Sequence, residues 1–174
     1  MKTQSFNEIE NLTKEYSMIP ICKEIYADVI TLIQLLRKME AFDKNFFLLE
    51  SVEGGEKWAR YSFLGYEPVL HITCKNGKVT QKSGEIEHTV TVDPMDALRQ
   101  LLHKYKSPKI EGMPTFTGGF VGDFGYEMIG YAEPKLNIKD SEFDDYNLML
   151  FDKVIVYDHL KQKIMVIANM KSKD

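Results

Sequence analysis

From residue 46 to residue 82 the chain consists of short β-rich runs separated by turn residues, and this pattern most restricts its possible folds. Asn76-Gly77 lies between two such runs and is typical of a two-residue type I′ hairpin. Ser83-Gly84 predicts another turn a few residues later. Strands joined by such short turns pair antiparallel. The sequence therefore predicts an antiparallel meander.

Segments with helical periodicity occur on both sides of this meander. Ser5 to Glu8 has capping-box spacing and predicts a short helix. The run from Val29 to Met39 predicts a second helix with Asp28 as its N-cap, and Asp93-Pro94 predicts the start of a third. Further strands are expected at 19–26, 117–126, 153–157 and 163–168, and exposed loops at 106–115 and 131–145. Since helices and strands do not alternate regularly, we expect an α+β fold, a largely antiparallel sheet with flanking helices.

The size and composition favour one ordinary globular domain spanning residues 1–174. Hydrophobic residues make up 44% of the chain and charged residues 28%, which excludes disordered and fibrous classes. There is no apolar run long enough for a membrane helix and no secretion signal, so we expect a cytoplasmic protein that does not bind membranes. The net charge of −4, without long basic blocks, argues against nucleic acid as a partner.

The residues most often used in catalysis and metal binding show no matching pattern. Cys22 and Cys74 lie far apart in apolar runs and are expected to be buried thiols, and the histidines lack metal-ligand spacing. Gly119, Gly122 and Gly125 are not followed by a phosphate-binding signature, so we expect them to mark a bulge or the close approach of another backbone. We therefore predict no catalytic residue, no metal ligand and no cofactor in this chain.

Glu50 and Ser51 follow a strongly apolar run, and Arg60 begins the next one. A carboxylate and a hydroxyl at a strand end suit a small polar ligand, whereas the alternative is a turn capped by Ser51. Arg60 suits either a ligand carboxylate, Glu50, or a surface ion pair. The residues alone leave these alternatives open.

The run from Phe47 to Gly65, FLLESVEGGEKWARYSFLG, closely resembles the amino-terminal region of anthranilate synthase component I. Further similarities follow in the order of that family, at 118–122, 125–127, 151–159 and 167–169. The resemblance implies the amino-terminal part of that fold. It also implies that the carboxy-terminal chorismate-binding domain, which carries the catalytic groups and the magnesium ligands, is absent from this chain.

The resemblance further implies a function for the parent protein. Enzymes of this family convert chorismate to anthranilate and pyruvate with ammonia from a glutaminase component II, and they require magnesium. Their Leu-Leu-Glu-Ser element forms part of the feedback site for L-tryptophan, and here it implies Leu49, Glu50 and Ser51, with Arg60 nearby. We expect the isolated chain to be inactive and to bind tryptophan weakly. The alternatives are component I of aminodeoxychorismate synthase and a stand-alone amino-acid sensor without catalysis.

Overall fold

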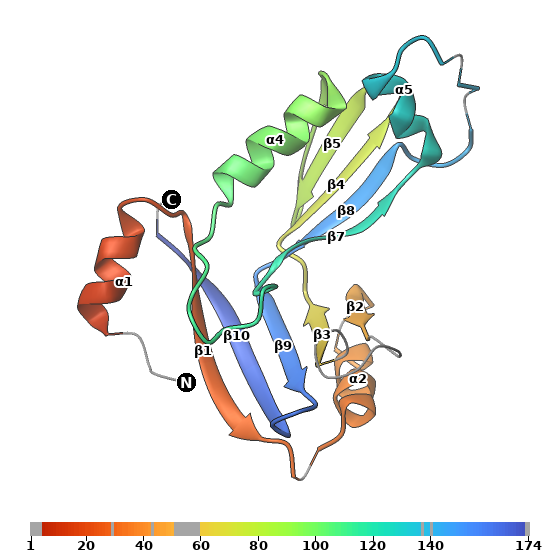
Figure 1. Cartoon of the computed structure of the whole chain (residues 1–174). Helices are drawn as coiled ribbons and strands as arrows, with labels where there is room; N and C mark the ends of the chain where they lie inside the picture. The colour runs from red at the N-terminus through yellow and green to blue at the C-terminus, as the bar shows by residue number, and fades with distance from the viewer. Residues whose placement is uncertain are drawn as a thin grey trace. The chain divides into compact units, whose positions relative to one another are not determined.

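The computed structural model describes residues 5–28, 30–42, 44–50, 60–136, 138–139 and 141–172 (Figure 1). The chain divides into two compact units, the first made of Met1–Pro68, Lys106–Gly119 and Phe151–Asp174 and the second of Val69–Tyr105 and Phe120–Leu150. The assignment of residues 1–174 to one domain stays a prediction. The α+β class is confirmed, but the strands form two five-stranded sheets instead of the one long sheet expected.

The first unit contains a sheet with the strand order β1-β10-β9-β3-β2, in which the neighbouring strands are antiparallel (Figure 1). Helix α2 covers part of one face, where Leu35, Leu36 and Met39 pack against the cluster of Leu64, Ile155 and Ile164. The elements are α1 (Phe6–Thr13), β1 (Met18–Tyr26), α2 (Leu32–Glu40), β2 (Phe46–Leu49), β3 (Tyr61–Tyr66), β9 (Lys153–Asp158) and β10 (Lys163–Lys171).

Both helices of this unit begin with a capping box. The one predicted at Ser5 is confirmed, because Glu8 N–H donates to the Ser5 side chain and the Glu8 carboxylate accepts from Ser5 N–H. For α2 the predicted cap was wrong: Thr31, not Asp28, occupies the N-cap. Gln34 explains the difference, since its side chain accepts from Thr31 N–H at 2.9 Å while its own N–H donates to Thr31 Oγ1.

The second unit contains a sheet with the strand order β6-β5-β4-β8-β7. The Asn76-Gly77 hairpin is confirmed, because both residues have positive φ, 51° and 73°, as a type I′ turn requires. Asp93 caps α4 as predicted, and Ala97, Leu98 and Leu101 of this helix join the buried cluster of the sheet. The elements are β4 (Leu70–Lys75), β5 (Lys78–Ser83), β6 (Ile86–Thr91), α4 (Pro94–Lys104), β7 (Gly119–Phe124), η1 (Tyr126–Met128), α5 (Ile129–Ala132) and β8 (Tyr146–Phe151).

The segment 131–145 differs most from the sequence prediction of an exposed loop. Its first residues belong to α5, and its last residue, Asp145, is only 1% exposed. Strand β8 follows directly and was not predicted, although Tyr146, Leu148 and Leu150 alternate with less buried residues. Close packing explains the glycine at 122, as expected: a Cβ there would overlap the carbonyl oxygen of Asn147.

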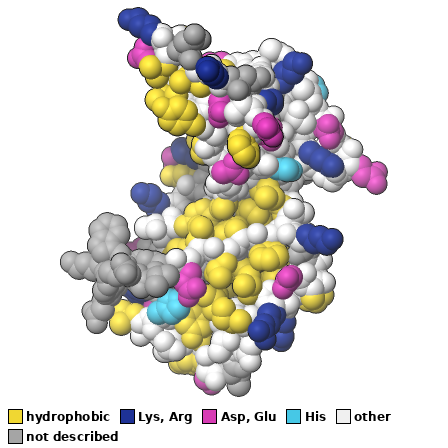
Figure 2. All heavy atoms as spheres, turned by 90° about the vertical axis from the view of Figure 1, so that its right-hand side faces the viewer, with side chains coloured by type: hydrophobic (Ala, Val, Ile, Leu, Met, Phe, Trp, Pro, Cys, Tyr) yellow, Lys and Arg dark blue, Asp and Glu magenta, His cyan; other side chains and the backbone are white. Residues whose placement is uncertain are grey.

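Hydrophobic side chains gather over a broad area in the lower part of Figure 2, which corresponds to the first unit. On the sheet of this unit, the pairing register places Ile21, Ile25 and Val166 on one face, and all three are substantially exposed. In the part of the chain that the structure describes, the helices are too short or too polar to cross a membrane.

Candidate functional site

Three of the four residues predicted to bind a ligand, Leu49, Glu50 and Arg60, lie at one end of three neighbouring strands of the first unit. Leu49, the last residue of β2, pairs with Phe63 of β3, and Tyr61 at the start of β3 pairs with Asp158 at the end of β9. Glu50 and Arg60 therefore lie at the same end of the sheet as Asp158. Ser51 lies outside the described residues.

Arg60 and Asp158 form a two-pronged ion pair at this end. Arg60 Nε donates to Asp158 Oδ1 at 3.1 Å, and Nη2 donates to Oδ2 at 2.7 Å. The Asp158 side chain is 4% exposed, whereas that of Arg60 is 27% exposed. Of the alternatives open for Arg60, the structure therefore shows an ion pair, with Asp158 as the acid.

The surroundings of Asp158 stabilise its charged form. Its Oδ1 also accepts from the N–H groups of Leu160 and Lys161, at 3.1 and 3.0 Å. Burial alone would raise the pKa of this carboxyl, but the Arg60 guanidinium and these N–H donors outweigh burial and hold the pKa below its ordinary value. Asp158 is therefore ionised at neutral pH.

The remaining contacts of Arg60 fix its position further. Its guanidinium carbon lies 4.7 Å from the centre of the Tyr61 ring, and its backbone carbonyl accepts from His159 N–H at 2.9 Å. Ser62 Oγ lies 2.7 Å from His159 Nε2, a distance that also suits a nucleophile and its base. Ser62 is fully buried, however, so this pair supports the strand end and cannot reach a substrate.

Leu49 and Glu50 complete the described part of this strand end. The Leu49 side chain is 47% exposed, and Glu50 is exposed as well. An exposed apolar side chain, a carboxylate and a held guanidinium match the three parts of an apolar amino acid: its side chain, its ammonium group and its carboxylate.

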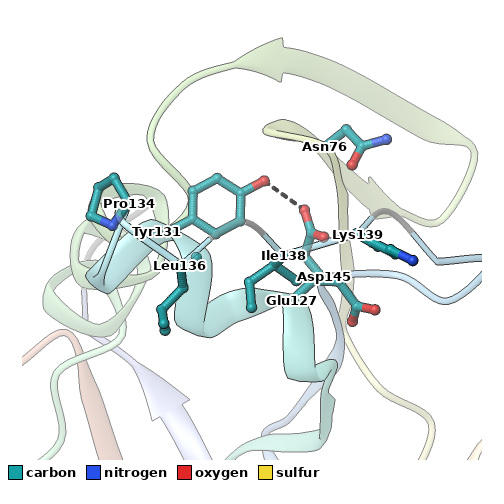
Figure 3. A pocket seen from close by; sticks show the side chains of 9 residues that line it. Asn76, Glu127, Tyr131, Pro134, Leu136, Ile138, Lys139 and Asp145 are labelled. Atoms are coloured by element: carbon teal, nitrogen blue, oxygen red, sulfur yellow. Dashed lines mark hydrogen bonds between the residues drawn. The ribbon is translucent and has the colours of Figure 1, made fainter.

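The other unit contains a pocket at the segment 131–145, which was expected to be an exposed loop. It is an open pocket of about 500 Å³ that includes Tyr131, Leu136, Ile138 and the buried Asp145 in its lining. Figure 3 shows the Tyr131 hydroxyl pointing at the Asp145 carboxylate, to which it donates at 2.8 Å. Glu127 and Lys139 also line it, so the lining carries charges of both signs.

The side chains that donate hydrogen bonds to Asp145 are neutral. Besides Tyr131, the thiol of Cys74 donates to its carboxylate at 3.5 Å. Burial and the neighbouring Asp145 raise the pKa of Cys74 to about 12 and that of Tyr131 well above its ordinary value. Burial also raises the pKa of Cys22 to about 11. Cys74 is a buried thiol as predicted, whereas Cys22 is only partly buried. In the described residues, no three His, Cys, Asp or Glu side chains are grouped to hold a metal ion.

Comparisons with known proteins agree with this fold. Anthranilate synthase component 1 of Acetivibrio thermocellus is 38% identical over 169 residues, which is 95% of this chain and 34% of the relative. The same protein of Acinetobacter calcoaceticus is 34% identical over 180 residues, 98% of this chain and 36% of the relative. No protein-family model matches the chain. The chain thus spans about a third of the length of the curated relatives it matches.

A solved structure supports the same relationship. The crystal structure of anthranilate synthase component I from Streptococcus pneumoniae TIGR4 matches 86% of this chain, with a TM-score of 0.54 and 29% sequence identity, and the match covers 32% of that chain. The two antiparallel sheets with their helices therefore define an α+β fold shared with a known biosynthetic enzyme. The chain is a relative of anthranilate synthase component 1, homologous to about a third of that protein.

Proposed function

We propose that this chain is the amino-terminal, tryptophan-binding regulatory part of an anthranilate synthase component 1. Besides the similarity to such proteins, one observation carries the proposal: the strand end that holds Leu49 and Glu50 also holds Arg60. In this proposal Glu50 binds the ammonium group of L-tryptophan, Leu49 and Ser51 contact its body, and Arg60 binds its carboxylate.

The parent enzyme converts chorismate and ammonia to anthranilate and pyruvate in tryptophan biosynthesis, in the cytoplasm. In this proposal a carboxy-terminal chorismate-binding domain supplies the catalytic groups and the magnesium ligands, and a glutaminase component II supplies ammonia. The exposed Ile21, Ile25 and Val166 provide an apolar surface for that domain. We expect the isolated chain to produce no anthranilate from chorismate, magnesium and ammonia, which a fluorescence assay of anthranilate checks.

A chimeric enzyme tests the regulatory proposal. This chain would replace the homologous segment of the Acetivibrio thermocellus protein, and inhibition by L-tryptophan would be measured. Glu50→Gln should raise the half-inhibitory concentration about tenfold, because hydrogen bonds to charged groups contribute about 1.5 to 3 kcal/mol. Ser51→Phe should relieve inhibition while sparing turnover. Glu10→Gln, an exposed glutamate of α1, is the matched control. Unchanged inhibition in the Glu50 and Ser51 variants would remove this strand end from the site.

Binding by the chain itself separates the proposal from the stand-alone sensor. If the second wall of the pocket belongs to the other domain, L-tryptophan should bind this chain with a dissociation constant of about 1 mM, since a lost apolar wall costs on the order of 2 to 4 kcal/mol. An NMR titration should place the shifts near Leu49, Glu50 and Arg60. A micromolar constant would instead favour the sensor.

The product of the native full-length protein separates the proposal from the folate-pathway alternative. The parent protein in that case would be component I of aminodeoxychorismate synthase. The uninterrupted run from Leu48 to Gly65 favours anthranilate synthase. If the native full-length protein released aminodeoxychorismate in place of anthranilate, the alternative would be correct.

A further inference from the structure

The geometry of the Arg60 ion pair leaves part of the guanidinium available to a ligand. Asp158 accepts hydrogen bonds from Nε–H and from one N–H of Nη2. The other N–H groups, on Nη1 and on the outer side of Nη2, are not used by Asp158. The Arg60 side chain retains 27% of its exposure, while Asp158 lies behind it with 4%. A buried acid thus holds one edge of the guanidinium group, while the Arg60 side chain stays partly exposed.

Asp158 is itself fixed from several directions. Two backbone N–H groups, those of Leu160 and Lys161, donate to its Oδ1. The next residue, His159, donates its N–H to the carbonyl of Arg60 and contacts Ser62 through its ring. Backbone and side chain therefore join the end of β9 to the start of β3. A long flexible arginine side chain is restricted to one orientation by this arrangement.

We propose that Asp158 is a positioning residue that holds the Arg60 guanidinium to receive the carboxylate of an amino-acid ligand at this strand end. This inference rests on the proposed function and deepens it, because it assigns a task to a residue that does not touch the ligand. Since Asp158 and Arg60 together are neutral, recognition depends on the orientation of the N–H groups more than on net charge. Loss of Asp158 should then weaken carboxylate binding even though it leaves Arg60 with a larger unbalanced charge.

Three related ligands distinguish binding of the carboxylate from binding of the ammonium group. L-Tryptophan carries both charged groups, tryptamine lacks the carboxylate, and indole-3-propionate lacks the ammonium group. Dissociation constants are measured by NMR titration of the 174-residue chain. Asp158→Asn should raise the constants of L-tryptophan and indole-3-propionate about fivefold and should change that of tryptamine less than twofold. Glu50→Gln should weaken the binding of L-tryptophan and tryptamine and leave the binding of indole-3-propionate unchanged.

A double-mutant cycle and a matched control exclude a general structural effect. In the background of Arg60→Ala, Asp158→Asn should have no further effect on any probe. Glu67→Gln removes an exposed ion pair with Lys153 at the opposite end of β3 and should change none of the affinities. Because Arg60 Nε donates to Asp158, its N–H signal should be distinct and slowly exchanging in the original chain and should be lost in Asp158→Asn.

The same measurements distinguish a failure of the proposed function from a failure of the positioning role alone. If L-tryptophan shifts no residue near Leu49 and Arg60, the proposed function fails and this inference fails with it. If L-tryptophan binds and Glu50→Gln acts as expected, but Asp158→Asn strengthens carboxylate binding or affects all three probes equally, only the positioning role is overturned. The same holds if Asp158→Asn retains its effect in the Arg60→Ala background.

Discussion

Among the described residues, each of the two units buries one aspartate at a strand end, and the two are stabilised in different ways. Asp158 in the first unit faces the guanidinium of Arg60 and two backbone N–H groups. Asp145 in the second unit faces the hydroxyl of Tyr131 and the thiol of Cys74, both neutral. Arg60 keeps contact with solvent, whereas the immediate donors of Asp145 carry no charge that could be presented to a ligand.

The difference separates two uses of a buried carboxylate. With a cationic partner, Asp158 orients a charged group that stays available at a strand end. With neutral donors, Asp145 joins structural elements: its own N–H donates to Cys74 O of β4, its carbonyl accepts from Gly125 N–H, and Tyr131 contacts it from α5. The first arrangement suits recognition, and the second suits the packing of the sheet against the segment that follows β7.

The largest expected effect concerns Asp145. Asp145→Ala should lower the free energy of unfolding by about 3 kcal/mol, because it leaves the Tyr131 hydroxyl and the Cys74 thiol without their acceptor. Urea denaturation followed by far-ultraviolet circular dichroism measures the change. Glu142→Ala, an exposed carboxylate in the same segment, is the control and should be neutral. A loss below about 1 kcal/mol for Asp145→Ala would remove the distinction drawn between the two aspartates.

Close packing beside Asp145 provides the next test. Gly122→Ala should cost about 2 kcal/mol, because the added methyl group would overlap the backbone of Asn147 on the adjacent strand. At Gly130 in α5, the nearest atom to an added Cβ is a side-chain carbon of Ile138 at 3.6 Å, an ordinary contact. Gly130→Ala should therefore be neutral or stabilising, and urea denaturation measures both variants. Equal costs for the two substitutions would contradict the packing argument.

The ion pair of the first unit should contribute less and should depend on pH. Asp158→Asn is expected to cost about 1 to 2 kcal/mol at pH 7, a value reduced by the solvent that reaches Arg60. Because the folded state lowers the pKa of Asp158, the stabilisation is complete above the ordinary aspartate pKa of about 4 and is lost as pH falls through the lowered value. The stability difference between the two proteins should thus shrink below pH 4. A constant difference from pH 7 to pH 2 would show that charge is not its source.

The smallest expected effects concern the N-cap residues of one helix in each unit. Thr31→Ala and Asp93→Ala remove the N-caps of α2 and α4 and should each cost about 1 kcal/mol. Asp28→Ala, at the position first expected to cap α2, should leave the unfolding free energy unchanged. A larger loss at Asp28 than at Thr31 in guanidinium denaturation would reverse the capping assignment.

Local signals in the sequence predicted most of the elements, because turns and caps depend on neighbouring residues. The Asn76-Gly77 hairpin and the Ser5 and Asp93 caps are such cases. The division into two sheets was not predictable in this way, since it depends on which distant strands pair. Strand β8 was missed although Asp144-Asp145 precedes an alternating apolar run, which is a usable signal.

The site was predictable only in part, and for the same reason. The motif resemblance singled out Leu49, Glu50, Ser51 and Arg60, and the structure brings Glu50 and Arg60 to one strand end. Asp158 could not be identified as the partner of Arg60, because the two residues are far apart in the sequence and meet only through the pairing of β3 with β9. Ligand binding at these residues stays a prediction.

The pairing of β1 with β10 has a consequence for the order in which the chain folds. The two strands come from opposite ends of the described sequence and pair along their whole length, from Met18 with Lys171 to Tyr26 with Lys163. During synthesis, β1 leaves the ribosome early and has no neighbour until β10 follows. The second unit, which is formed entirely from the intervening residues, can fold first and shorten the loop that the first sheet must close. Such long-range closure slows folding, so the sheet that carries Arg60 and Asp158 should form after the second unit.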